Sequence, residues 1–373
     1  MNDERVAIVG VGYSTVGRST GLTLNELMTQ AAVAAMDDAG IRPDDVDGLS
    51  TMGGFAIANA WMLGITPLDW FLDAELGPAF LYPAVHSIAA IQAGLCHTCI
   101  VIRLIQRTPA SVTMPPAMDG NRDPGQFTVP FGSIAPTHWA GLMTRRHMIE
   151  YGTTEEQFAA HAVAQREHAR RNDDALVRDP LTIDDYLAAR YVSKPVRILD
   201  CDYPCDAGSA VIFTTEARAR DCRKPPVFVD SYAMSAVYDG FETLPDMTRT
   251  APTQCARTLW SRSSLRPTDV DCAHLYDGFT IITFQWLEAL GLCRPGESGP
   301  FVACGHTRLG GRVPVNTDGG ACNVGRRHGA NFCIEATRQL RGECGARQVP
   351  GAEVAVVTNG VGPFAAAALL TGS

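Results

Sequence analysis

The sequence is short of charge and has no long run of either sign. Charged residues make up 19% of its 373 positions, and 31 basic against 40 acidic side chains give a formal net charge of −9. The lack of a basic stretch argues against nucleic acid or an anionic membrane surface as a partner. Any anionic ligand must therefore be met by local positive charge.

Signals for secretion and membrane insertion are also missing. Residues 1–5 run directly into the apolar stretch VAIVGVG, without a basic region followed by a long apolar one. No segment reaches the ~18 consecutive apolar residues that indicate a membrane-spanning helix. We therefore expect a cytoplasmic protein with no membrane span.

Signatures of a metal or a dinucleotide are incomplete. Cys96 and Cys99 form a lone CxxC pair, Cys201 and Cys205 are four positions apart, and neither pair has a second Cys/His pair at zinc-site spacing. The stretch VGVGYSTVG (9–17) does not meet the GxGxxG pattern of a dinucleotide loop. We expect reduced, mainly structural cysteines, no metal, and no cofactor bound by this chain.

An internal repeat is the clearest positive feature. The segments IRPDDVDGLSTMGGF (41–55) and LRPTDVDCAHLYDGF (265–279) align without a gap, and they share Arg-Pro, Asp-Val-Asp and a closing Gly-Phe. So many matches in so short a stretch indicate two copies of one structural unit.

Each copy has the pattern of an α/β unit. Strand-like runs at 6–12 and 226–234 begin the two halves, and LNELMTQAAVAAMDDAG (24–40) has helical spacing with a closing glycine. Continuous apolar runs at 99–104 and 353–359 predict buried strands. We expect an α/β fold of parallel-rich sheets covered by helices on both faces.

The segment between the copies breaks this pattern. Residues 106–185 contain a loop-like stretch rich in proline and then the helix-like EEQFAAHAVAQREHARRN, so we expect an inserted cap or lid. The predicted organisation is an N-terminal half at 1–105 plus 186–225, an insertion at 106–185, and a C-terminal half at 226–373.

A glycine-rich stretch, PVNTDGGACNVGRRHGAN (314–331), combines bare backbone with positive charge. Several glycines in one turn-rich run indicate positive φ angles or the close approach of another group. Two adjacent arginines followed by a histidine suit a ligand that carries or develops negative charge.

The order of these segments resembles that of the thiolase superfamily. The resemblance rests on the two halves, the insertion, CDYPCDAGSAVIFTTE (201–216), HLYDGF (274–279), the glycine-rich stretch and VVTNGVGPFAAAALL (356–370). Within the superfamily they are most similar to the sterol carrier protein thiolase and lipid-transfer-protein branch. The resemblance implies a duplicated, five-layered αβαβα fold with an acyl-CoA between the halves.

The same resemblance shows which thiolase groups are replaced. The family's nucleophilic cysteine corresponds to about Gly77, and its second cysteine to about Thr358, so both thiols are missing. The Asn-Glu-Ala-Phe motif corresponds to residues 276–279, and the Gly-His-Pro motif to residues 325–327. Because the glycines are kept while the reactive groups differ, we expect a changed reaction.

The changed pattern is similar to that of the aldolases of steroid side-chain degradation, which cleave a β-hydroxyacyl-CoA into a ketone and a shorter acyl-CoA such as propionyl-CoA. A family tyrosine stands at the position of Tyr276, whereas Arg326 replaces a second family tyrosine. We predict four catalytic residues. Tyr276 is the base or acid, Arg326 stabilises the enolate and lowers the pKa of the tyrosine, and His328 relays a proton or pairs with Asp277.

Backbone and amide groups of the glycine-rich loops are expected to bind the substrate or its CoA, including oxyanion donors near 319–320 and 359–360. The predicted substrate-binding residues are Gly319, Gly320, Gly325, Gly329, Asn359 and Gly360. A locally basic part of the insertion leaves open contact with CoA phosphates or a solvated helix face. Its members are Arg145, Arg146, His147, Arg166, His168, Arg170 and Arg171.

The resemblance also implies partners. We expect a homodimer formed through the first-half sheet, and an OB-fold partner carrying an acyl-CoA-associated domain, sometimes fused to a hydratase. The coenzyme A thioester is then a substrate and no cofactor. Two alternatives stay open: a Claisen-type thiolase or acyltransferase subunit, and a non-catalytic acyl-CoA or lipid-binding subunit of a complex.

Overall fold

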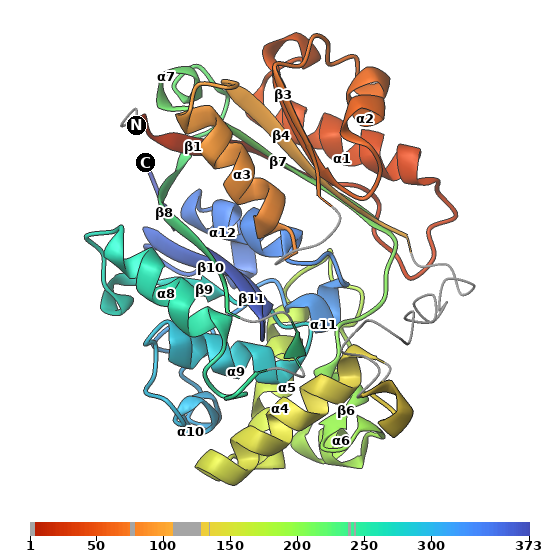
Figure 1. Cartoon of the computed structure of the whole chain (residues 1–373), viewed down its shortest axis with the longest axis vertical. Coiled ribbons are helices and arrows are strands. Elements are labelled where there is room, and N and C mark those ends of the chain that lie inside the picture. The colour runs from red at the N-terminus through yellow and green to blue at the C-terminus, as the bar shows by residue number, and fades with distance from the viewer. Residues whose placement is uncertain (1–3, 75–78, 107–127, 134, 238–239, 242–243) are drawn as a thin grey trace.

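Two sets of strands, one from each half of the chain, form the frame of the molecule (Figure 1). The computed structural model describes residues 4–74, 79–106, 128–133, 135–237, 240–241 and 244–373. The elements of the first half are β1 (Val6–Tyr13), α1 (Leu24–Ala39), η1 (Pro43–Asp45), β2 (Gly48–Met52), α2 (Ala56–Leu63), β3 (Trp70–Asp73), α3 (Leu81–Gln92), β4 (Thr98–Ile105), β7 (Ala207–Thr215) and α7 (Glu216–Ala219).

The second half has the same plan with different loops. Its elements are β8 (Val227–Ala236), α8 (Ala251–Ser261), η7 (Pro267–Asp269), β9 (Cys272–His274), α9 (Thr280–Ala289), α10 (Ser298–Ala303), α11 (Ala321–Val324), α12 (Ala330–Leu340), η8 (Gly345–Arg347), β10 (Val354–Val361) and β11 (Phe364–Thr371). The predicted helix at 24–40 is confirmed as α1, which ends at Gly40 with a φ of 73°.

The strands follow the order β3-β2-β4-β7-β1-β8-β11-β10-β9. The halves meet where β1 and β8 pair antiparallel, Ala7 opposite Phe228 and Ile8 opposite Val227. The expectation of parallel-rich sheets is wrong, because β7 is antiparallel to both β1 and β4, and β11 to both β8 and β10. A continuous apolar run indicates that both faces of a strand are buried. It does not reveal whether the strand runs parallel or antiparallel to its neighbours.

The helices form layers with the two sets of strands. One core packs α1 on the outer face of β1, β4 and β7, and another packs α8 and α9 on the outer face of β10 and β11. A third core lies between the halves and contains α3, α12 and strand residues from both. Neighbouring residues of β10 show the two faces, since Val356 lies in the outer core and Val357 in the central one. The result is the expected αβαβα arrangement.

The repeated RPxDVD segments do the same structural work in both halves. Each forms a single 3-10 turn, η1 or η7, just before β2 or β9. The last aspartate of each then accepts backbone hydrogen bonds at the start of a neighbouring strand: Asp47 from Thr98 N at 2.7 Å, and Asp271 from Val354 N at 2.9 Å. The repeat is therefore a device that aligns two strands, placed once in each half.

The insertion lies outside the large sheet. The described elements that begin within the predicted 106–185 segment are η4 (Val129–Phe131), α4 (Pro136–Tyr151), α5 (Glu155–Ala169) and α6 (Ile183–Ala188). The next elements fall in the 186–225 segment assigned to the N-terminal half, but they also lie outside the large sheet: β5 (Tyr191–Ser193), β6 (Val196–Arg197) and η5 (Ile198–Asp200). Strands β5 and β6 form a separate hairpin that contacts α4. In Figure 1 these elements lie below the second-half strands, on the side of α9 and α11.

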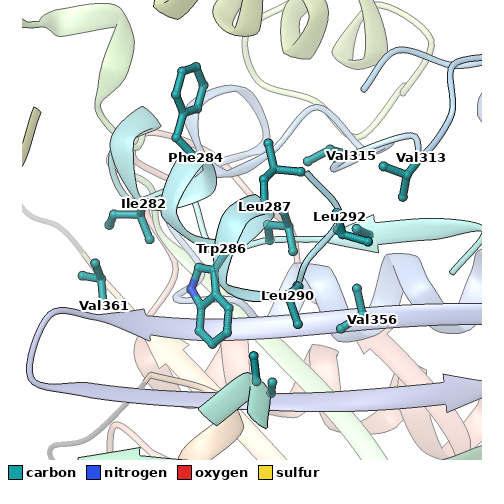
Figure 2. Packing of buried hydrophobic residues seen from close by; sticks show 14 of the residues in the cluster. Ile282, Phe284, Trp286, Leu287, Leu290, Leu292, Val313, Val315, Val356 and Val361 are labelled. Atoms are coloured by element: carbon teal, nitrogen blue, oxygen red, sulfur yellow. The ribbon is translucent and has the colours of Figure 1, made fainter. Parts of the chain in front are cut away.

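The core around α9 fixes one end of β10. Figure 2 shows Trp286 among apolar side chains that include Leu290, Val356 and Val361. The Trp286 indole N–H donates to Gly360 O at 3.0 Å. A buried indole satisfied in this way ties α9 to the glycine-containing end of β10.

The Asn316 side chain joins the glycine-rich stretch to the end of β9. It is fully buried, accepts from Leu275 N at 2.7 Å and donates to Leu275 O at 2.9 Å. Its backbone N–H also donates to Ala273 O at 2.9 Å. The amide therefore pairs with the peptide of Leu275 much as a neighbouring strand would.

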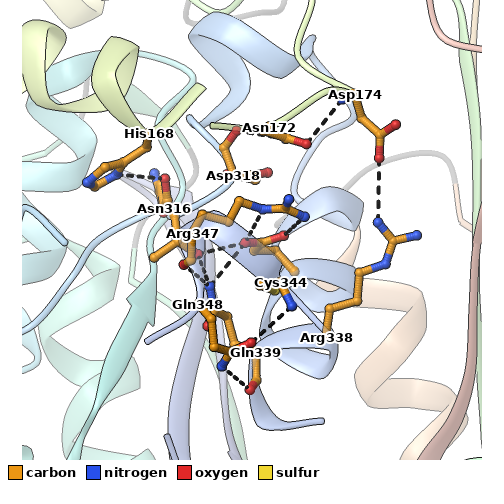
Figure 3. A network of polar contacts seen from close by, with 12 residues as sticks. His168, Asn172, Asp174, Asn316, Asp318, Arg338, Gln339, Cys344, Arg347 and Gln348 are labelled. Atoms are coloured by element: carbon orange, nitrogen blue, oxygen red, sulfur yellow. Dashed lines mark hydrogen bonds and ion pairs between the residues drawn. The ribbon is translucent and has the colours of Figure 1, made fainter. Parts of the chain in front are cut away.

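A buried ion pair supports the other side of this stretch. Glu335 on α12 accepts from Thr317 Oγ1 at 2.8 Å and from Arg347 Nε at 2.9 Å. Burial alone would raise the pKa of Glu335, but its bonds to Arg347 hold that pKa below the usual range. Figure 3 shows Arg347, Gln339 and Gln348 in the polar network around this ion pair, in which Gln339 Nε2 donates to Arg347 O at 2.8 Å.

We expect Asn316→Ala to lower the free energy of unfolding by about 2–5 kcal/mol, because it leaves a buried N–H and C=O of Leu275 without partners. Urea unfolding followed by circular dichroism measures this. The control Asn25→Ala removes an exposed asparagine from α1 and should stay within about 0.5 kcal/mol of the unmodified protein. Equal stability of the two variants would contradict the role given to Asn316.

Candidate active site

Tyr276 lies two residues beyond the end of β9, where the two halves face each other. Its backbone N–H donates to Thr358 Oγ1 on β10 at 3.1 Å. The phenol ring folds back over Gly278, where a Cβ atom would lie 3.2 Å from the Tyr276 hydroxyl. A side chain at position 278 would crowd the ring, which would have to shift by a few tenths of an ångström.

Burial dominates the protonation of Tyr276. It raises the pKa of the phenol, and the carboxylate of Asp202 raises it further, whereas Arg326 and Arg103 lower it. The net direction is upward. Arg326 does lower the pKa of Tyr276, as predicted, but burial raises it by more. The phenol is therefore protonated at neutral pH and can donate a proton.

Arg326 and His328 are in contact, which the sequence analysis did not predict. Arg326 Nε lies 2.7 Å from His328 Nε2 and 3.2 Å from Asp202 Oδ2. His328 has a φ of 50°, and its carbonyl accepts from Phe80 N, just before α3, at 3.0 Å. The second-half loop that carries both residues is thus attached to the first half.

Arg103 is a site residue that the sequence analysis missed. Its Nη2 lies 2.6 Å from His328 Nδ1, on the side of the ring opposite Arg326. Burial, and then Arg326, lower the pKa of Arg103 to about 10, so it remains charged. The signal in the sequence was a lone charge within the apolar run CIVIRL, which forms β4.

Asp277 is anchored elsewhere. Its Oδ1 accepts from Ala321 N at 3.0 Å, and burial raises the pKa of the carboxyl well above its usual range. The Asp277 side chain bonds Ala321 through Oδ1, and its Oδ2 has no hydrogen-bond partner among the described residues, so the structure does not bring Asp277 and His328 together as a bonded pair. Asp277 holds the turn at the start of α11.

The predicted glycines face protein atoms. Each of the four in the glycine-rich stretch has positive φ, and a Cβ atom would collide with a neighbour. The pairs are Gly319 with Ala169, Gly320 with Asp277, Gly325 with Cys205 and Gly329 with Asn359. The N–H groups of Gly319 and Gly320 already donate to Asn316 O and Asp318 Oδ1, both at 2.9 Å. These two amides are occupied inside the loop.

Asn359 keeps a donor for a ligand. Its Oδ1 accepts from Leu81 N at 2.9 Å, while its buried Nδ2 has no hydrogen-bond acceptor among the described residues. This amide group lies against Gly329, next to His328. Gly360 contributes its carbonyl to Trp286, as described above.

A cavity of about 370 Å³ borders this site on the side of the insertion. Its wall includes Asp202 from the first half and Thr280 and Cys322 from the second half. From α5 come His161 and Gln165, whose Nδ1 and Oε1 are buried without partners among the described residues. None of the four predicted catalytic residues lines this cavity or a larger hollow of about 730 Å³ beside β1 and α1, and the smaller cavity meets the site through Asp202.

Two basic residues of α5 support the glycine-rich loop. Arg166 Nε donates to Asn323 Oδ1 at 2.6 Å, and His168 Nδ1 lies 3.3 Å from Asn316 O (Figure 3). Both side chains are buried, so neither lies on a solvated helix face. Arg146 and Arg171, by contrast, are exposed.

Comparison with known proteins places this geometry in a family. A model described as thiolase C-terminal domain-like matches residues 235–371. The chain is 34% identical to the 17-hydroxy-3-oxo-4-pregnene-20-carboxyl-CoA lyase of Mycobacterium tuberculosis, over 97% of this chain and 98% of that protein. It is 32% identical to a steroid side-chain-cleaving aldolase of Thermomonospora curvata, over 90% of each.

The chain belongs to the thiolase superfamily, in the branch of the steroid side-chain-cleaving aldolases. A solved structure, the Ltp2-ChsH2(DUF35) aldolase, superposes with a TM-score of 0.90 at 30% identity, covering 99% of this chain and 98% of that one. Human mitochondrial 3-ketoacyl-CoA thiolase, at 14% identity and a TM-score of 0.72, shares the fold. The predicted family, the α/β thiolase fold and the expected class of carbon–carbon lyase are confirmed.

The two positions that carry reactive cysteines in thiolases correspond here to about Gly77 and Thr358. The position near Gly77 lies outside the described residues, and Thr358 uses its hydroxyl to accept from Tyr276 N. Burial raises the pKa of Cys205 to about 11 and that of Cys201 to about 12. These nearby thiols are therefore protonated and poor nucleophiles.

We expect Gly320→Ala to destabilise the protein more than Gly342→Ala does. Both glycines have a φ close to 71°, but a Cβ at Gly342 meets nothing, whereas one at Gly320 collides with Asp277. The ψ of 168° at Gly320 lies in a region that is essentially restricted to glycine, so the expected difference of about 1–3 kcal/mol by urea unfolding combines backbone strain with the collision. An equal loss of stability in the two variants would contradict this prediction.

Proposed function

We propose that the protein cleaves a β-hydroxyacyl-CoA by a retro-aldol reaction into a ketone and a shorter acyl-CoA such as propionyl-CoA. The observation that carries this is a partly buried, protonated Tyr276 phenol near Arg103 and Arg326, the two arginines that contact His328. A proton donor next to clustered positive charge suits an enolate that forms and is then protonated.

The reaction needs three groups, and the site offers one for each. The carboxylate of Asp202 takes the proton of the substrate's β-hydroxyl as the ketone forms. The electron pair of the broken C–C bond becomes a thioester enolate, stabilised by Arg326 and by the N–H groups of His328 and Asn359. Tyr276 then protonates the α-carbon, and the proton held by Asp202 returns to the phenolate.

The acyl chain is proposed to derive from a steroid side chain. The names of the Mycobacterium tuberculosis and Thermomonospora curvata relatives describe a steroid-derived acyl-CoA and steroid side-chain cleavage. The 370 Å³ cavity beside Asp202 is the described space next to the reacting groups. A Claisen-type reaction receives less support, because burial raises the pKa of Cys201, Cys205 and Cys322.

We further propose a partner of the DUF35 kind, with the OB fold expected from the family, working in the cytoplasm. The close structural match to the Ltp2-ChsH2(DUF35) aldolase, whose name includes a DUF35 component, supports such a partner. No helix among the described residues is both long and apolar enough to span a membrane.

A homodimer through the first-half sheet is supported by an exposed apolar surface. We call it the α2–β3 patch: Phe55, Ile57, Trp61, Met62 and Phe71, on and beside α2 and the edge strand β3. Trp61 is 80% exposed and Phe71 50%. Adjacent exposed aromatic residues beside an unpaired strand edge favour burial against a second copy.

Tyr276→Phe is expected to lower kcat for release of ketone and propionyl-CoA by roughly 10²- to 10⁴-fold, because it removes the acid that protonates the enolate. The assay uses a tertiary β-hydroxyacyl-CoA with a steroid ring system, with and without a co-expressed DUF35-type partner. Retained substrate binding in the variant, measured by calorimetry, separates lost chemistry from lost folding.

The matched control for this experiment is Tyr232→Phe, which removes a hydroxyl that bonds Gln92 at 2.7 Å far from the site. It should keep kcat. Binding without turnover in the unmodified protein, even with its partner, would favour the non-catalytic alternative. Trapping of an acyl group on a cysteine would favour the Claisen alternative.

We expect the protein to sediment as a dimer and Trp61→Glu to shift it toward monomer, because a charge would be buried in the α2–β3 patch. Analytical ultracentrifugation measures this at micromolar concentration. Ile149→Glu, which changes an exposed apolar residue on α4, is the control and should remain dimeric. A monomeric unmodified protein would overturn the proposed interface.

A further inference from the structure

His328 presents a conflict of hydrogen bonding. Its Nδ1 lies 2.6 Å from Arg103 Nη2, and its Nε2 lies 2.7 Å from Arg326 Nε. Both guanidinium groups can only donate, whereas a neutral imidazole has one accepting nitrogen and one N–H. An imidazolium would offer no acceptor at all. One of the two contacts must therefore give way.

The surroundings decide which contact is kept. Arg103 is 8% exposed, and its Nη1 also donates to Met52 O at 2.7 Å and to Leu104 O, so its guanidinium is held on several sides. Arg326 has a side chain that is 26% exposed and a second partner, Asp202, at 3.2 Å. Moving Arg326 toward Asp202 costs little, whereas moving Arg103 would leave buried carbonyls without a donor.

We propose that Arg103 is a positioning residue that fixes the tautomer of His328, with Nδ1 accepting from Arg103 and Nε2 carrying the proton. The Nε2–H then points away from β4, toward Arg326 and the space near Tyr276. When substrate binds, Arg326 stays with Asp202 and His328 donates this N–H to the thioester oxygen. Arg103 acts through His328, without touching the substrate. The catalytic part rests on the proposed function, but the tautomer does not.

The arrangement also links the two halves of the fold. Arg103 comes from β4 of the first half, and His328 from the loop before α12 in the second half. The phenol of Tyr276 is close enough to Arg103 that its ionised form would raise the pKa of the guanidinium. The contact from Arg103 therefore ties the direction of the His328 N–H to β4 of the opposite half.

The test is nitrogen-15 NMR of protein labelled at its nine histidines, with the His328 signals assigned by their loss in His328→Asn. In the unmodified protein we expect shifts of an unprotonated Nδ1 and a protonated Nε2. Arg103→Met should abolish this single-tautomer pattern. Arg103→Lys, which keeps a donor, should retain it in part. A protonated Nδ1 in the unmodified protein would overturn the proposal, whether or not Arg103→Met folds.

Arg341→Met provides the control for a lost buried arginine. Arg341 has a fully buried side chain and donates to the carbonyls of Pro225 and Val9, away from the site. We expect this variant to lose stability but to leave the His328 signals unchanged. Unchanged His328 signals in a folded Arg103→Met would equally overturn the proposal.

Activity gives a second readout. With the steroid acyl-CoA, Arg103→Met should lower kcat roughly 10- to 100-fold with little change in KM, because the donor is misdirected while the binding surface stays intact. A correct tautomer without any turnover of this substrate would refute the proposed function and leave the role of Arg103 in fixing His328 intact. The other tautomer of His328 together with normal turnover would refute the role of Arg103 and leave the proposed function intact.

Discussion

The pairing of the Asn316 side chain with the Leu275 peptide sets the geometry of the site. Leu275 directly precedes Tyr276, and the chain that continues from Asn316 carries Arg326 and His328. A shift at this bond would therefore move the phenol relative to the cations. The Glu335–Arg347 ion pair supports the same loop through Thr317, so polar groups buried beneath the loop hold its register.

Burial and positive charge act on Tyr276 in opposite directions, and burial wins. This result explains why an arginine can stand beside the phenol without turning it into a phenolate. The cations are then free to act on the charge that develops in the substrate. Because Arg103 comes from one half and Arg326 from the other, the charge gathers only at the junction of the two units.

Local patterns in the sequence predicted most of the fold. The helix at 24–40 and the 3-10 turn within each RPxDVD segment rest on bonds between near neighbours, and the helix appears as expected. Strand direction, the Arg103–His328 contact and the separation of Asp277 from His328 depend on residues far apart in the chain, so no spacing revealed them. The domain limits and the roles of the site residues remain predictions.

In this loop, the glycines are needed for packing, whereas the polar side chains are the candidates for the chemistry. The glycines meet protein atoms, as Gly320 meets Asp277, so the backbone path is needed whatever the reaction. Restoring a thiol would therefore not restore thiolase chemistry. The hydroxyl of Thr358 is fully buried and already bonded to Tyr276 N, and burial keeps the pKa of nearby Cys205 raised. The surroundings, and not the missing cysteines alone, therefore disfavour a reactive thiol, which is consistent with the proposed acid–base role of the Tyr276 phenol.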